Sequence, residues 1–184
     1  MNRLEDAQRT LKQADCLCSA EQVEAAYARL SAEISAEYRD KNPLILCVMI
    51  GGLVPTAEIL KRLDFPFELD YLHATRYRGA TRGGGLIWKR QPGAELAGRH
   101  VLVIDDILDE GHTLVAIRKA LLEFQPASLK VAVLAEKLHE RRAAGAFAEF
   151  IGLDLPDRYV FGCGMDYKEY WRQLPAIYAV RRET

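Results

Sequence analysis

Short, continuously apolar segments recur along this chain and constrain its fold more than any other feature. The clearest are PLILCVMI (residues 43–50), VLVI (101–104) and the run at 130–135. A strand with one face in water alternates apolar and polar residues, so continuous apolar runs predict strands that are buried on both faces. Such strands are typical of parallel sheets that are covered by helices on each side.

Segments with helical periodicity lie between these runs. The first spans about residues 19–40, where Ser19 and Gln22 are spaced to form a capping box. Further helices are expected at about 55–63 and 113–124, and shorter strands at 67–75, 86–91, 150–155 and 159–162. This order of strands and helices predicts an α/β fold, in which a mostly parallel twisted sheet is flanked by helices.

The composition limits the partners of the chain. Its 25 basic and 26 acidic residues leave a formal net charge of −1, which disfavours binding to nucleic acids or membranes through bulk charge. The N-terminal segment is polar, and no apolar run approaches the roughly 20 residues of a membrane-spanning helix. These features predict a cytoplasmic protein. The four cysteines lack the spacing of a zinc site and are expected to be reduced and mostly buried.

The apolar run at residues 101–104 leads straight into acids. Asp105 and Asp106 follow it directly, and Asp109 comes three residues after them. Neighbouring carboxylates repel each other and resist removal from water. Ligands of parallel α/β sheets bind beyond the carboxyl ends of the strands, and a ligand or cation bound there would compensate the acids.

The residues that follow Asp109 suit the binding of a phosphate. Gly111 permits a tight turn, Thr113 supplies a hydroxyl, and the next helix presents free N–H groups and the positive end of its dipole. Asp105 and Asp106 can accept hydrogen bonds from sugar hydroxyls, directly or through a divalent cation. The stretch therefore predicts a site for a phosphorylated ribose. The alternative is a strand that ends in a solvated acidic loop.

Two longer motifs resemble a known family. VLVIDDILDEGHT (residues 101–113) resembles the signature of the type I phosphoribosyltransferases, which bind 5-phosphoribosyl diphosphate. LPDRYVFGCGMDYKEYWRQLPAIYAV (155–180) is similar to the purine-binding end of the hypoxanthine-guanine phosphoribosyltransferases. The resemblance implies one domain with the type I fold. Its core would span about residues 40–150, and the N-terminal segment with about 151–184 would form a small hood.

The resemblance also implies an activity. It is the Mg²⁺-dependent transfer of a phosphoribosyl group to hypoxanthine or guanine, which yields IMP or GMP and releases pyrophosphate. Members of the family form homodimers or homotetramers, so the same is expected of this chain.

Roles follow for the acids and for the phosphate loop. Asp105 and Asp106 correspond to the acids that meet the ribose hydroxyls and, with Asp166, the metal. Asp109 corresponds to the acid near N7 of the purine, a candidate general base or acid that also borders the ribose phosphate. The 5′-phosphate loop corresponds to Glu110, Gly111, His112 and Thr113. The alternative for the histidine is an ordinary surface residue.

Purine binding is implied for three residues. Lys137 corresponds to the donor that meets the 6-oxo group, a role that suits a side chain with donors only. Tyr159 corresponds to the aromatic residue that stacks on the base, and Val160 to a backbone contact with it. The alternatives are a solvent-exposed lysine at a strand end and a plain core aromatic.

Pyrophosphate binding is implied for Ile50, Gly51 and Gly52, through their backbone amides, and for Arg172. Ile50 stands where the family often has a lysine, so pyrophosphate is expected to be held mainly by the backbone and Arg172. Asp166 and Arg172 have an alternative interpretation as an exposed ion pair.

The segment RYRGATRGGG (76–85) matches the flexible lid of the family in position. Arg76 and Tyr77 stand where the lid usually has a Ser-Tyr pair. Closure of such a lid would exclude water from the reacting sugar.

Two other functions remain open. The first is a phosphoribosyltransferase that prefers xanthine. The second is a non-catalytic regulator of the same fold that senses nucleotides or RNA, although the chain lacks a basic patch beyond the lid segment.

Overall fold

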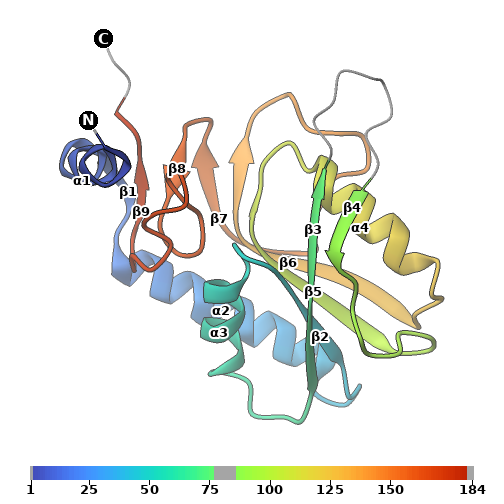
Figure 1. Cartoon of the computed structure of the whole chain (residues 1–184). Coiled ribbons are helices and arrows are strands. Elements are labelled where there is room, and N and C mark those ends of the chain that lie inside the picture. Colours follow the sequence, from blue (N-terminus) through green and yellow to red (C-terminus); the bar gives the residue numbers. More distant parts are fainter. Residues whose placement is uncertain (1, 77–85, 182–184) are drawn as a thin grey trace.

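The computed structural model describes residues 2–76 and 86–181. Its centre is a twisted six-stranded sheet with the order β4-β3-β2-β5-β6-β7 (Figure 1). The strands are β2 (Leu44–Val48), β3 (Glu68–Arg76), β4 (Leu86–Arg90), β5 (His100–Leu108), β6 (Ser128–Leu138) and β7 (Phe150–Pro156). All neighbouring strands are parallel except β3 and β4. The predicted mostly parallel sheet is confirmed.

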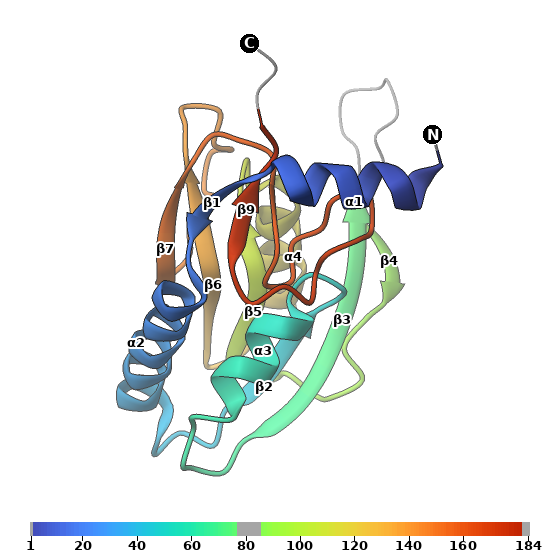
Figure 2. The same ribbon diagram turned by 90° about the vertical axis from the view of Figure 1, so that its left-hand side faces the viewer.

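Helices cover both faces of this sheet (Figures 1 and 2). On one face, α2 (Ala20–Tyr38) and α3 (Leu53–Leu60) share an apolar cluster with Leu102 and Ile104 of β5. On the other face, α4 (His112–Leu122) packs with Val101 and Val103 of the same strand. Successive side chains of a strand point to opposite faces. Each apolar run is therefore continuous because both faces of the sheet are buried.

The helix ends agree with the sequence in part. Ser19 caps α2, and the capping box is present: the Ser19 N–H donates to Gln22 Oε1 at 2.8 Å, and the Gln22 N–H donates to Ser19 Oγ at 3.4 Å. The expected bounds of α3 are wrong. It begins at Leu53, because Gly52 already turns the chain into the helix, and Pro55 is accommodated in the first turn, where no N–H is required.

The two ends of the chain form a second, smaller sheet, which we call the hood. It has the order β1-β9-β8 and consists of β1 (Asp15–Cys18), β9 (Ile177–Ala179) and β8 (Val160–Phe161), all antiparallel. The large sheet includes β7 up to Pro156, so it continues past the boundary expected near residue 150.

Helix α1 (Arg3–Gln13) and the strands β1 and β9 were not expected from the sequence. Figure 2 shows α1 lying across the C-terminal segment. The indole N–H of Trp171 donates to the carbonyl of Ala7 at 2.9 Å, and Lys168 Nζ donates to Asp6 at 2.6 Å. The N-terminal helix therefore braces the loop between β8 and β9.

Two general expectations can be compared with the described residues. All four cysteines are reduced, and three of them are buried, whereas Cys16 is exposed. Among the helices that the structure describes, none has the length and apolar character needed to cross a membrane.

Leu30 tests the packing of α2 on the sheet. It is fully buried, so we expect Leu30→Ala to lower the free energy of unfolding by about 2–5 kcal/mol, since it removes apolar contacts and leaves a cavity. Urea denaturation measures this loss. Leu4→Ala is the matched control, because Leu4 is 51% exposed on α1 and should change stability by about 0.5 kcal/mol or less. Equal losses in the two variants would contradict the packing.

Candidate active site

Strand β5 carries the acid pair inside the sheet rather than beyond it. The pairing of β5 with β6 continues past the acids, with Asp105 opposite Val133 and Leu108 opposite Glu136. The strand is longer than the run of residues 100–106 that the sequence suggests, because the parallel ladder with β6 extends it to Leu108.

The two acids are partly buried, and they are held in place by local hydrogen bonds. Asp105 Oδ1 accepts the N–H of Asp106 at 2.9 Å, and Asp106 Oδ1 accepts the N–H of Ile107 at 2.7 Å. Burial raises the pKa of both carboxyls, and the charge of Asp106 raises that of Asp105 further. A cation or hydroxyl donors would relieve this cost, so the solvated loop of the alternative interpretation is not what the structure shows.

Two glycines let the backbone close around Asp106. A Cβ at Gly51 would lie 2.0 Å from Asp106 Oδ2, and a Cβ at Gly164 would lie 2.2 Å from the Gly51 carbonyl oxygen. Gly164 also has a φ of +104°, which favours glycine. It was missed in the sequence, although the FGCG pattern after β8 was a signal. These contacts bring the hood, the loop 50–52 and the acid pair together.

The loop 50–52 offers fewer backbone donors than expected. The N–H of Gly52 donates to the carbonyl of Val48 at 2.9 Å where α3 begins, so this amide already has an acceptor, and its contact with pyrophosphate stays a prediction. Within the described part of the chain, no acceptor is found for the N–H groups of Ile50 and Gly51. The Ile50 side chain is half exposed.

The phosphate cradle at the start of α4 has the expected form. Gly111 is the N-cap residue with a φ of +78°, and no side chain caps the first turn, which contains His112 and Thr113. The N–H groups of this turn and the helix dipole are thus available to an anion. Glu110 does not oppose this, because its carboxylate lies 3.5 Å from Arg141 Nε and 3.7 Å from His112 Nε2.

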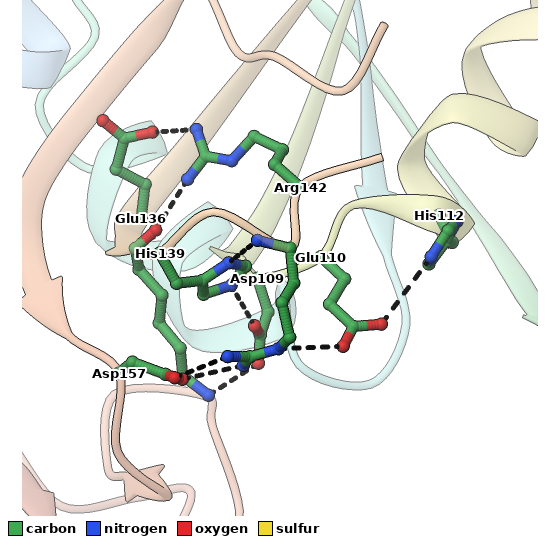
Figure 3. A network of polar contacts seen from close by, with 9 residues as sticks. Asp109, Glu110, His112, Glu136, His139, Arg142 and Asp157 are labelled. Atoms are coloured by element: carbon green, nitrogen blue, oxygen red, sulfur yellow. Dashed lines mark hydrogen bonds and ion pairs between the residues drawn. The ribbon is translucent and has the colours of Figure 1, made fainter. Parts of the chain in front are cut away.

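Asp109 follows β5 and is held by two donors (Figure 3). Lys137 Nζ lies 2.6 Å from Oδ2, and His139 Nε2 lies 2.8 Å from Oδ1. Burial opposes ionisation of Asp109, but the hydrogen bonds from Lys137 and His139 outweigh it and lower its pKa. His139 was missed in the sequence, where it sits in a charged run without a motif.

The Lys137 side chain is only 12% exposed, so it is not the solvent-exposed lysine of the alternative interpretation. Tyr159 is 53% exposed, and its ring meets that of Tyr167 edge-on with 5.7 Å between the centroids. It is therefore not a core aromatic, and its exposed ring is free to stack on a base. Val160 is buried at the start of β8.

Asp166 and Arg172 form a partly exposed ion pair of 2.6 Å, as in the alternative interpretation. Arg172 also donates to the carbonyl of Gly164 at 2.6 Å, and its charge favours the ionised forms of Asp105 and Asp106. The carboxylate of Asp166 is thus engaged by Arg172 in this structure. No group of three acidic, histidine or cysteine side chains that could hold a metal is found in residues 2–76 and 86–181.

The lid segment is described only at its edge. The backbone of Arg76 ends β3, and Tyr77 lies outside the described residues.

Comparison with known proteins gives consistent matches. The family model of the phosphoribosyl transferase domain matches residues 14–168. The hypoxanthine-guanine phosphoribosyltransferase of Streptococcus pneumoniae (strain R6) is 34% identical over 169 residues, which are 91% of this chain and 93% of that protein. The hypoxanthine-guanine-xanthine phosphoribosyltransferase of Tritrichomonas foetus is 34% identical over 161 residues, 88% of each chain.

Solved structures agree. A hypoxanthine phosphoribosyltransferase from Staphylococcus aureus has a TM-score of 0.87 at 27% identity and covers 98% of this chain and 96% of its own. A hypoxanthine-guanine-xanthine phosphoribosyltransferase has a TM-score of 0.83 at 31% identity, with 91% and 97% covered.

In this sheet an acid pair and an anion cradle lie together at the carboxyl end of a parallel strand. That combination defines a class of enzymes that act on sugar phosphates. The chain belongs to the phosphoribosyltransferase family. The resemblance of its C-terminal motif to the hypoxanthine-guanine phosphoribosyltransferases is confirmed by relatives of that name.

Asp105 provides a test of the electrostatics. Burial raises the pKa of Asp105 on folding. The stability that its protonated carboxyl contributes is therefore fully present below the unfolded pKa and is lost as the pH rises through the folded pKa. Without ligand, Asp105→Asn should therefore raise the Tm at neutral pH by about 2–4 °C, or about 1 kcal/mol, and the gain should shrink as the pH falls.

Thermal melts over a range of pH measure this gain. Asp154→Asn is the matched control, since Asp154 is exposed on β7 and its substitution should leave the Tm within about 1 °C. A lower Tm for Asp105→Asn at neutral pH would contradict the unfavourable burial of its charge.

Proposed function

We propose that this phosphoribosyltransferase joins N9 of hypoxanthine or guanine to C1′ of 5-phosphoribosyl diphosphate and releases pyrophosphate, yielding IMP or GMP. The observation that carries the proposal is the placement of Lys137 and Asp109, 2.6 Å apart, at the ends of β6 and β5. This pair lies next to the free N-terminus of α4. A hydrogen-bond donor for the purine, Lys137, and a proton acceptor, Asp109, thus lie beside the helix N-terminus that can bind a phosphate.

The purine is bound between the core and the hood. Lys137 donates to the 6-oxo group and so excludes a 6-amino group, which offers only donors in that position. Tyr159 stacks on the base, and the backbone at Val160 contacts its edge. The lowered pKa keeps Asp109 ionised, so it can accept and hold the proton at N7 while N9 forms the new bond.

The ribose and its phosphate occupy the end of β5. The first turn of α4 binds the 5′-phosphate, and Asp105 and Asp106 accept hydrogen bonds from the ribose hydroxyls. As the bond to pyrophosphate breaks, C1′ gains positive charge. Nearby carboxylates stabilise that charge without a covalent nucleophile.

Mg²⁺ fits the same acids. Asp105 and Asp106 are adjacent carboxylates whose pKa values are raised by burial, and a divalent cation would offset that cost. Asp166 is paired with Arg172 in this structure, so it would add a further oxygen ligand only by leaving that ion pair. When bound, Mg²⁺ supplies charge neutralisation for the leaving pyrophosphate. Arg172 and the free N–H groups of Ile50 and Gly51 hold the pyrophosphate from the protein side.

The proposal also covers the location, assembly and partners of the enzyme. We expect a cytoplasmic protein that assembles as a homodimer or homotetramer and that binds neither nucleic acid nor membrane. Xanthine is kept as a second candidate base, because a relative from Tritrichomonas foetus bears xanthine in its name.

A base panel tests the proposal. Purified protein with 5-phosphoribosyl diphosphate and Mg²⁺ should convert hypoxanthine and guanine, and adenine should react at least about 100-fold more slowly, since Lys137 cannot pair with an amino group. Absorbance changes on nucleotide formation measure each rate. Faster turnover of xanthine than of guanine would favour the second candidate. No turnover with any base, while 5-phosphoribosyl diphosphate still binds, would favour a regulator.

Lys137→Ala tests base recognition. Loss of a charge-assisted hydrogen bond should raise the KM for guanine and hypoxanthine by about 10- to 100-fold. Steady-state kinetics at saturating 5-phosphoribosyl diphosphate give this value. Lys119→Ala is the control, since Lys119 is exposed on α4 and its removal should leave KM unchanged. An unaltered KM in Lys137→Ala would exclude the lysine from purine binding.

A further inference from the structure

His139 contacts the proposed acid–base residue from a position that no motif marks. Its Nε2 lies 2.8 Å from Asp109 Oδ1, and Lys137 occupies Oδ2 of the same carboxylate (Figure 3). In the proposed function Lys137 also serves the purine. Among residues 2–76 and 86–181, Asp109 is the only group with a proposed substrate role that the His139 side chain contacts, so this hydrogen bond serves that carboxylate.

The hydrogen bonds of the imidazole indicate which nitrogen carries the proton. The backbone N–H of Arg141 donates to Nδ1 at 3.1 Å. A neutral imidazole that accepts at Nδ1 bears its hydrogen on Nε2, so Nε2 donates to Asp109 Oδ1. The His139 side chain is 3% exposed, and water therefore has little access to take over this hydrogen bond.

Arg141, two residues after His139, links this segment to the two strands that neighbour β6. Arg141 pairs with Asp157, which follows β7, at 2.7 Å, and its Nε lies 3.5 Å from Glu110, which follows β5. These ties join the ends of the two strands that flank β6. They hold the imidazole at a set distance from Asp109.

Resting on the proposed function, we infer that His139 is a positioning residue whose Nε2–H fixes Asp109 Oδ1, so that Oδ2 faces the N7 proton while Lys137 donates to the 6-oxo group of the purine. Without this hydrogen bond the carboxylate can rotate about its terminal bond. A reacting group that moves by about 1 Å loses on the order of 100-fold in rate.

Two substitutions separate the hydrogen bond from the bulk of the ring. In His139→Asn, the amide oxygen falls near the position of Nδ1 and can still accept from Arg141, but the side chain is too short to reach Asp109. In His139→Gln, the longer side chain places an N–H near the position of Nε2. His139→Asn therefore removes the donor to Asp109, and His139→Gln restores it, while both replacements are amides of similar polarity.

We expect His139→Asn to lower kcat about 10- to 100-fold with little change in the KM for 5-phosphoribosyl diphosphate. His139→Gln should recover most of the loss. The acid limb of the kcat/KM profile should move to higher pH in His139→Asn, because loss of a donor raises the pKa of Asp109, which must be ionised to accept a proton. Lys137 pairs with Asp109 directly, and the same network holds the ion pairs of Arg141 with Glu110 and Asp157 and of Arg142 with Glu136 (Figure 3). Neither substitution replaces any of these charged residues.

Three controls accompany these variants. His100→Asn replaces a histidine at the opposite end of β5, where Nδ1 contacts Ser128 Oγ at 2.8 Å, and should retain wild-type kcat. Asp109→Asn should lose turnover sharply and keep substrate binding, and the Asp109→Asn/His139→Asn double variant should lose no more than Asp109→Asn alone. Thermal melts confirm folding of each protein.

The outcomes distinguish the two proposals. Wild-type kcat and an unmoved acid limb in His139→Asn, beside an inactive Asp109→Asn, would overturn only the role of His139, and so would equal losses in the Asn and Gln variants. A wild-type protein that converts no purine would overturn the proposed function, and the positioning role with it. In that case ¹⁵N NMR of the imidazole still reports whether Nε2 carries the hydrogen.

Discussion

The parallel pairing of β5 with β6 is the constraint on which the site depends. Its register sets Asp105 opposite Val133 and Leu108 opposite Glu136, so Asp109 emerges level with Lys137. Leu102 and Ile104 pack under α2 and α3, whereas Val101 and Val103 pack under α4. A shift by one residue would move each side chain to the opposite face and disrupt the close packing of both clusters. The geometry proposed for purine recognition and proton transfer is therefore set by the packing of the core.

This strand end holds carboxylates in opposite environments. Asp105 and Asp106 are partly buried beside each other, and their pKa values are raised. Asp109 receives hydrogen bonds from Lys137 and His139, and its pKa is lowered. The first two acids would thus gain from a cation or from sugar hydroxyls, whereas the lowered pKa of the third favours its ionised form, as its proposed role of proton acceptor requires.

Much of the central sheet could be predicted from the sequence, because an apolar run reports directly that both sides of a strand are covered. The terminal elements could not. Helix α1 buries only Ala7 and Thr10, and its few apolar residues, Leu4, Ala7 and Leu11, do not show which surface they meet, although the capping box of Asn2 and Glu5 was a signal. Strand β1 exists because it pairs with β9, at the other end of the chain, and no local pattern reports such a partner.

The site divides in the same way. The fold class, the acid pair and the glycine turn before α4 could be predicted from the residues alone, because these depend on residue type and on local turn geometry near the end of a strand. Three contacts are visible only in the folded chain: His139 donates to Asp109, the N–H of Gly52 donates to Val48, and the backbone of Gly164 packs against that of Gly51. These contacts join segments that are distant or unpatterned in the chain, and their geometry follows from strand register and close packing.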